Sequence, residues 1–159
     1  MKLSIIFHSA SGNTEKVAQV MKDAVQNIEG VEAMAMSIDS VDNNFIKESD
    51  AVIFGCPTYA GTLSWQMKRF LDTIPLNLTG KLGGVFVTED YYGGGADIAE
   101  LSIIGCLLVR GMLVYSGGAA AGAPKTHLGA VLRKGGDDFE LERAQVLAQR
   151  IAKKALEIF

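Results

Sequence analysis

Short apolar runs alternate with stretches of helical periodicity along the whole chain. The four clearest runs cover residues 3–7, 51–56, 83–88 and 112–115. Runs that are hydrophobic on both faces are typical of strands in a parallel sheet that helices cover on both sides. A fifth run, residues 31–38, alternates more between apolar and polar positions and is predicted to be an edge strand.

Between these runs the apolar positions repeat with the spacing of one helical face. The pattern is clearest between Val17 and Ile28, with the polar start signals Thr14 and Glu15 before it and Gly30 after it. The same spacing predicts further helices over residues 63–74, 96–110 and 141–158, and a short, poorly marked helix over 41–47.

Strand and helix therefore alternate five times, and right-handed crossovers turn this order into a parallel sheet with helices on both faces. The predicted fold class is α/β. No linker or repeat interrupts the pattern, so residues 1–159 are predicted to form a single domain. The one long irregular segment, residues 116–138, is rich in Gly and Ala and contains Pro124, which suggests a surface excursion near a functional edge.

The composition excludes several classes of function. The chain has 159 residues, of which 48% are apolar, and a net charge of −3 without a basic run, so nucleic acid is not an expected ligand. The apolar run 103–109 is far shorter than the ~20 residues that span a bilayer, and we expect a cytoplasmic protein with no membrane contact. Cys56 and Cys106 belong to no CxxC pair, which argues against a disulfide framework or a structural zinc site.

Three loops carry the candidate chemistry, because ligands of open α/β sheets bind beyond the carboxyl ends of the strands. The first loop joins a predicted strand to a helix and offers hydroxyl and amide side chains, a glycine and free N–H groups, a combination that binds phosphate. It lacks the Lys of a Walker A loop and the GxGxxG pattern, which argues against ATP or GTP hydrolysis. An ordinary helix cap is the alternative interpretation. Its candidate residues are Ser9, Ser11, Gly12, Asn13 and Thr14.

The second and third loops have the residues to enclose a flat ring. In the second, backbone amides and small side chains could line a polar ring edge, and Gly61 could adopt a positive φ; a plain Pro-Thr turn is the alternative. In the third, a Tyr could stack on a planar ligand while the glycines leave room for it, or the tyrosines could simply pack. The candidate residues are Pro57, Thr58, Tyr59, Ala60, Gly61, Thr88, Glu89, Asp90, Tyr91, Tyr92 and Gly93.

These motifs, in this order, resemble the flavodoxin-like superfamily and, within it, flavodoxins and the NAD(P)H:quinone oxidoreductases of the WrbA type. Residues 9–14 resemble the phosphate loop of that family, and 55–61 with 66–72 resemble its second flavin loop and the following helix. The resemblance implies a three-layer doubly wound sandwich with a five-stranded parallel sheet of order 2-1-3-4-5. It also implies bound FMN, with the phosphate on residues 9–14, the ring edge and N5 region at 57–61, and the pyrimidine side at 88–93.

The resemblance leaves more than one function open. The main expectation is an FMN-dependent reductase that takes electrons from NAD(P)H and passes them to a quinone-like or other small-molecule acceptor. Assembly into a homo-oligomer is left open. The alternative is a flavodoxin, a one-electron carrier between redox protein partners. A third reading, a nicotinamide-binding domain with Asp39 on a ribose, lacks GxGxxG. Arg110 stands where the quinone reductases commonly carry a His near the flavin, and His127 could lie over the flavin or face solvent.

Overall fold

The computed structural model describes all residues from Met1 to Phe159. Its strands are β1 (Lys2–Phe7), β2 (Glu32–Ser37), β3 (Ala51–Tyr59), β4 (Thr62–Leu63), β5 (Leu82–Glu89), β6 (Leu113–Val114) and β7 (Ala130–Arg133). Its helices are α1 (Asn13–Val25), α2 (Asn43–Glu48), α3 (Trp65–Thr73), α4 (Ala96–Val109) and α5 (Asp138–Ile158), and a single 3₁₀ turn covers Ala119–Ala121.

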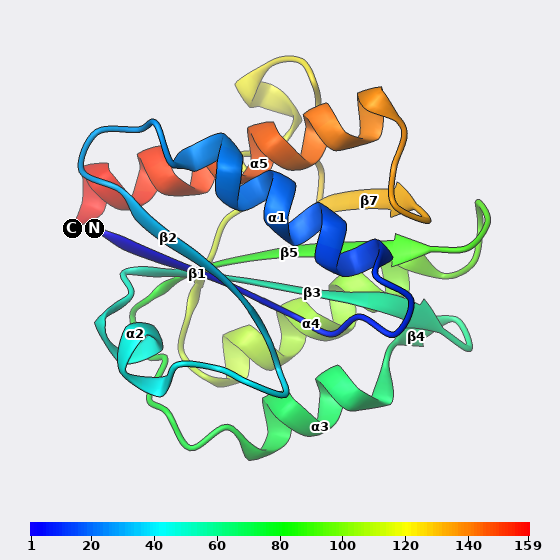
Figure 1. The fold of residues 1–159 in the computed structure, drawn as a ribbon, viewed down its shortest axis with the longest axis horizontal. Coiled ribbons are helices and arrows are strands. Elements are labelled where there is room, and N and C mark those ends of the chain that lie inside the picture. The colour runs from blue at the N-terminus through cyan, green and yellow to red at the C-terminus, as the bar shows by residue number, and fades with distance from the viewer.

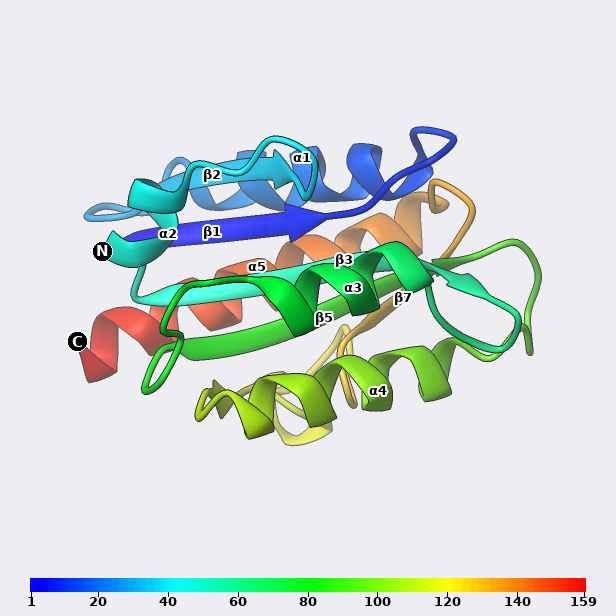
Figure 2. The ribbon, with the colours of Figure 1, turned by 90° about the horizontal axis from the view of Figure 1, so that it is seen from below.

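The strands form a central sheet between two layers of helices. The order along the sheet is β2-β1-β3-β5-β6, and neighbours on this path are parallel. Helices α1 and α5 lie side by side on one face, and α2, α3 and α4 cover the other (Figures 1 and 2). The predicted α/β sandwich with helices on both sides is therefore confirmed. No helix combines the length and the apolar character needed to cross a bilayer.

The sheet has seven strands, so the expected five-stranded sheet of order 2-1-3-4-5 was wrong in detail. The expected fifth strand, residues 112–115, is present as β6, which pairs with Leu82 and Gly83 at the start of β5. An additional strand, β7, pairs with residues 86–89 at the end of β5. Between them the chain leaves the sheet as the expected excursion. The strand β7 was missed because its four residues lie within the Gly- and Ala-rich segment that the sequence marks as irregular.

The strand β4 was missed for a different reason. Strand β3 continues through Tyr59, and the chain reverses at Ala60 and Gly61 to pair β4 antiparallel with β3. Both turn residues have positive φ, 48° and 80°, which is the geometry of the tightest hairpins. A two-residue strand in a stretch read as a loop leaves almost no signal of periodicity.

The packing explains why the apolar runs become strands. Strand β5 is buried along its whole length, since β3 pairs with it on one side, β6 and β7 pair with it on the other, and a helical layer covers each face. On one face Val17 and Met21 of α1 meet Ile5 and Ile53 of the sheet, and on the other face helices α2, α3 and α4 bury their apolar sides. The sheet is therefore a fixed platform for the loops at its carboxyl edge.

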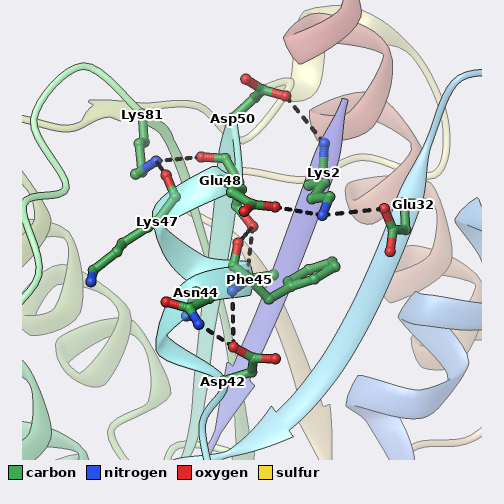
Figure 3. A network of polar contacts seen from close by, with 11 residues as sticks. Lys2, Glu32, Asp42, Asn44, Phe45, Lys47, Glu48, Asp50 and Lys81 are labelled. Carbon is green, nitrogen blue, oxygen red and sulfur yellow. Dashed lines mark hydrogen bonds and ion pairs between the residues drawn. The ribbon is translucent and has the colours of Figure 1, made fainter.

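A polar network closes the opposite edge of the sheet. Figure 3 shows Lys2 of β1 between Glu48, whose Oε2 lies 2.6 Å from Lys2 Nζ, and Glu32 at 3.6 Å. The backbone N–H of Lys2 donates to Asp50 Oδ2 at 3.1 Å, and Lys81 Nζ donates to the carbonyl of Lys47 at 2.9 Å. These contacts tie β1, β2, α2 and the start of β3 together at the amino ends of the strands.

Candidate functional site

The three candidate loops meet at the carboxyl ends of β1, β3 and β5, on the side where the strand arrows of Figure 1 point. Together with the turn between β7 and α5 they enclose a cavity of about 200 Å³. The cavity is lined by Ala10, Ser11, Asn13, Thr14, Pro57, Thr58, Tyr59, Thr88, Glu89, Asp90 and Lys134. Of the other candidate residues, Ser9, Gly12, Ala60, Gly61, Tyr91, Tyr92 and Gly93 lie in the same loops but do not line it.

The first loop leaves the start of α1 without a side-chain cap. Gly12 occupies the N-cap position with φ 86° and ψ −9°, and no side chain accepts a hydrogen bond from the first turn of the helix. Ser9 Oγ instead accepts the N–H of Gly12 at 3.1 Å, and Asn13 Nδ2 donates to Ser11 Oγ at 3.2 Å. The interpretation of this loop as an ordinary helix cap is therefore wrong. The bare amides and the positive end of the helix dipole suit an anion.

A buried pair of hydroxyls joins the first loop to the third. Thr14 Oγ1 and Thr88 Oγ1 lie 2.8 Å apart, and both residues are almost completely buried. Either hydroxyl can be the donor in this pair, and the oxygen of the donating hydroxyl can still accept a further hydrogen bond. The contact fixes the start of α1 relative to the end of β5.

The second loop contributes a buried polar atom with no hydrogen-bond partner in the protein. Thr58 lines the cavity, and its Oγ1 is buried and unpaired. Buried hydroxyls in native proteins nearly always have a partner, so this one points to a ligand with polar edge atoms. Beside it, the ring of Tyr59 meets that of His8 edge to face, with 6.4 Å between centroids. Burial lowers the pKa of His8, although the charge of Asp39 acts in the opposite direction.

The third loop is held by a hydrogen bond to the side chain of Glu89 and by contact with the second loop. Glu89 Oε2 accepts the N–H of Gly94 at 3.1 Å. A Cβ at Gly95, where φ is 101°, would lie 2.5 Å from the carbonyl oxygen of Gly61. Only a glycine therefore lets the two loops approach so closely.

The two tyrosines of the third loop differ in their surroundings. The hydroxyl of Tyr92 donates to Glu140 Oε1 at 3.4 Å, and the guanidinium of Arg133 lies 4.9 Å from its ring centroid. The two tyrosines are about equally exposed, at 67% and 65%, but the side chain of Tyr91 makes no such contact. Tyr91 is therefore the tyrosine available to stack on a ligand.

Lys134 is a cavity residue that the sequence did not reveal. It follows β7 with φ 54°, and its N–H donates to the carbonyl of Glu89 at 2.7 Å. Its Nζ lies 4.0 Å from Asp90 Oδ1. The segment Asp137–Glu140 has the spacing of a capping box, and this signal could have located the start of α5 and the turn before it.

The structure places three other residues of interest away from the cavity. Arg110 Nε donates to the carbonyl of Leu71 at 2.8 Å, so its guanidinium caps the end of α3. His127 is exposed within the excursion. Cys56 is buried, and burial raises the pKa of its thiol to about 11, although hydrogen bonds with Ser64 act against this shift. None of the three supplies a reactive group to the cavity.

Comparison with known proteins agrees with this geometry. The flavodoxin family model matches residues 5–95. A flavodoxin of Clostridium saccharobutylicum is 46% identical over 160 residues and all of both chains, and an NAD(P)H dehydrogenase (quinone) of Archaeoglobus fulgidus is 27% identical over 97% of each chain. A solved flavodoxin from the domain Archaea superposes with a TM-score of 0.80 at 25% identity, covering 98% of this chain and 99% of that one. On its sequence and its fold, this chain belongs to the flavodoxin family.

Proposed function

We propose that the protein binds FMN in the cavity at the carboxyl edge and serves as a one-electron carrier between redox protein partners. The observation that carries this proposal is the uncapped start of α1, which faces the same cavity as the unpaired Thr58 hydroxyl. One end of the cavity thus suits a phosphate, and the other suits the polar edge of a ring. When FMN is bound, its ring supplies the electron exchange and the protein supplies position and electrostatics.

The first loop is suited to the phosphate. Helix N-termini with glycine at the turn bind phosphate groups through backbone N–H donors and the helix dipole. The hydroxyls of Ser9 and Ser11 can add donors, since each now only accepts a hydrogen bond from a neighbour within the loop. In this proposal the phosphate is held by Ser9, Ser11, Gly12, Asn13 and Thr14.

The second and third loops are suited to the ring. Thr58 Oγ1 gains a partner at the polar ring edge, and Tyr91 can cover a ring face while Tyr92 stays bound to α5. The packing of Gly95 against Gly61 fixes the distance between the second and third loops. The proposed ring contacts come from Pro57, Thr58, Tyr59, Ala60 and Gly61 on one side and from Thr88, Glu89, Asp90, Tyr91, Tyr92 and Gly93 on the other.

The position of Arg110 favours a carrier over a reductase. The resemblance to quinone reductases implies a His near the flavin at this place in the sequence. Here Arg110 is bound to the carbonyls of Leu71 and Ile74 at the end of α3. The full-length identity of 46% to a flavodoxin also supports the carrier.

The test uses the apoprotein and then the FMN complex. Titration of apoprotein with FMN, followed by quenching of flavin fluorescence, should show one FMN per chain, and no uptake would overturn the proposal. The complex is next mixed anaerobically with NADPH or NADH. A carrier stays oxidised with both donors, yet its visible flavin absorption bleaches with dithionite.

A second candidate function is an NAD(P)H-linked reductase with a quinone-like acceptor. Its support is the Archaeoglobus fulgidus relative, which is 27% identical over nearly the full length of both chains. Rapid bleaching of the complex by NADPH or NADH in the same anaerobic experiment would favour this function over the carrier.

A further inference from the structure

We propose that Lys134 is a phosphate ligand of the flavin site and makes the protein prefer FMN to riboflavin. This inference rests on the proposed function and adds a cation from outside the three loops. The first loop contains no Lys or Arg, so nothing in it would supply a cationic side chain to the phosphate. Lys134 is the one Lys or Arg among the residues that line the cavity.

Lys134 lies at one end of the cavity, the end that is formed by the first loop. The next residue, Gly135, lies against this loop: a Cβ there would be 3.3 Å from Asn13 Oδ1 and 3.2 Å from Lys16 Cδ. Asn13 and Lys134 both line the cavity. The Lys134 side chain therefore starts beside the proposed phosphate position.

The turn that carries Lys134 is held at both ends. The N–H of Lys134 donates to Glu89 at the end of β5, and the N–H of Gly136 donates to the carbonyl of Arg133 at 3.0 Å. Buried Glu140 accepts the N–H groups of Arg133 and Asp137 at 3.2 Å and 3.0 Å. The Lys134 side chain thus extends from a backbone that is already held in place, which lowers the conformational entropy lost when its ammonium binds an anion.

The backbone of Lys134 is in a conformation that lysine rarely adopts. Its φ of 54° lies in the left-handed region, which is strained for a residue with a side chain. Two glycines follow directly, yet this position carries a long cationic side chain. The strained position lies next to a candidate binding site, where such strain is often functional.

The charge balance of the cavity gives the lysine a role. Glu89 and Asp90 lie on the proposed ring side of the same cavity, and their carboxylates repel a dianionic phosphate at its other end. Lys134 Nζ is 4.0 Å from Asp90 Oδ1, and both side chains are largely exposed, at 66% and 81%. This loose pair leaves the ammonium able to turn toward a phosphate, where a charge-assisted hydrogen bond is stronger.

The experiment compares two flavins that differ only in the phosphate. Apoproteins of the wild type, K134M, K134R and K16M are titrated with FMN and with riboflavin at several salt concentrations. Lys16 is the matched control because it lines the adjoining cavity with Lys134 but not the flavin cavity. We expect K134M to weaken FMN binding about 10-fold. We expect K134M to leave riboflavin binding unchanged and to reduce the salt dependence of FMN binding, while K134R and K16M stay near the wild type.

Two results would overturn the inference. One is FMN binding by K134M that equals that of the wild type, and the other is an equal loss for both flavins. K134G guards against an effect of backbone strain, because it removes the charge while relaxing the positive φ, and it should lose FMN affinity like K134M. If the wild type itself takes up no FMN, the proposed function is wrong, and the inference about Lys134 is wrong with it. If the wild type binds FMN and K134M binds it equally well, only the inference about Lys134 is wrong.

Discussion

Two threonines that line the same cavity differ in their hydrogen bonds. Thr88 shares a buried hydrogen bond with Thr14, whereas Thr58 Oγ1 has no partner in the protein. Thr58→Val should therefore leave the stability of the apoprotein unchanged or raise it by up to about 1 kcal/mol, yet weaken FMN binding about 5- to 10-fold. Thr88→Val should instead destabilise the apoprotein by about 1–2 kcal/mol.

Denaturant unfolding of the apoproteins and FMN titration measure the two effects separately. A large loss of apoprotein stability in Thr58→Val would show that its hydroxyl already has a partner. The contrast between the two variants matters because both remove one hydroxyl from the same cavity and keep the shape of the side chain.

The raised pKa of Glu100 predicts how the free energy of unfolding depends on pH. Burial, with a smaller effect from Asp97, raises the pKa of its carboxyl from 4.5 to about 8, and Arg143 acts in the opposite direction. At pH values between 4.5 and about 8, the Glu100 carboxyl is deprotonated in the unfolded chain but still protonated in the folded chain. The free energy of unfolding therefore falls as pH rises. The wild type should lose on the order of 5 kcal/mol across this window relative to Glu100→Gln.

The measurement is the free energy of unfolding of both proteins in denaturant at several pH values. Glu100→Gln cannot ionise, so its curve should be flatter between the same limits. Parallel curves for the two proteins would show that the carboxyl titrates normally in the folded state.

At the scale of elements, the sequence predicted what depends on local periodicity. The buried strands β1, β3 and β5 and the helices α1, α3, α4 and α5 all lie where their patterns indicate. The strand β7 and the turn after it have no such pattern, and their place depends on the long-range pairing of Glu89 with Arg133. That pairing brings Lys134 to the cavity, so a residue distant in the sequence from the three loops could not be assigned to the site in advance.

The contact between the second and third loops gives a prediction at this scale. A methyl group at Gly95 would collide with the carbonyl of Gly61 and would also occupy a φ of 101°. Gly95→Ala should lower the free energy of unfolding by about 2–4 kcal/mol and weaken FMN binding, because the loops must move apart. Denaturant unfolding and FMN titration check both effects.

Gly80→Ala is the matched control for this substitution. Gly80, outside the proposed site, also has a positive φ, 81°, but nothing lies within 4 Å of a Cβ placed there. It should show only the backbone cost, about 1–2 kcal/mol. Equal effects in the two variants would mean that the backbone conformation, and not the contact between the loops, accounts for the loss at Gly95.

At the scale of the whole molecule, the amino edge and the carboxyl edge of the sheet have different roles. The amino edge is closed by the network around Lys2, and the carboxyl edge carries the candidate site (Figures 1 and 3). A ligand that binds only the native state slows local opening only where that opening breaks its contacts. Hydrogen exchange should therefore distinguish the two edges.

Adding FMN to the apoprotein should slow amide exchange most in the loops after β1, β3 and β5 and in the turn at Lys134, all of which reach the cavity. Residues 26–31, between α1 and β2, lie at the amino edge and provide the internal control. Their exchange through local opening should stay unchanged. Mass spectrometry of peptides with and without FMN measures both regions in one sample, and equal slowing at both edges would contradict this division of the molecule.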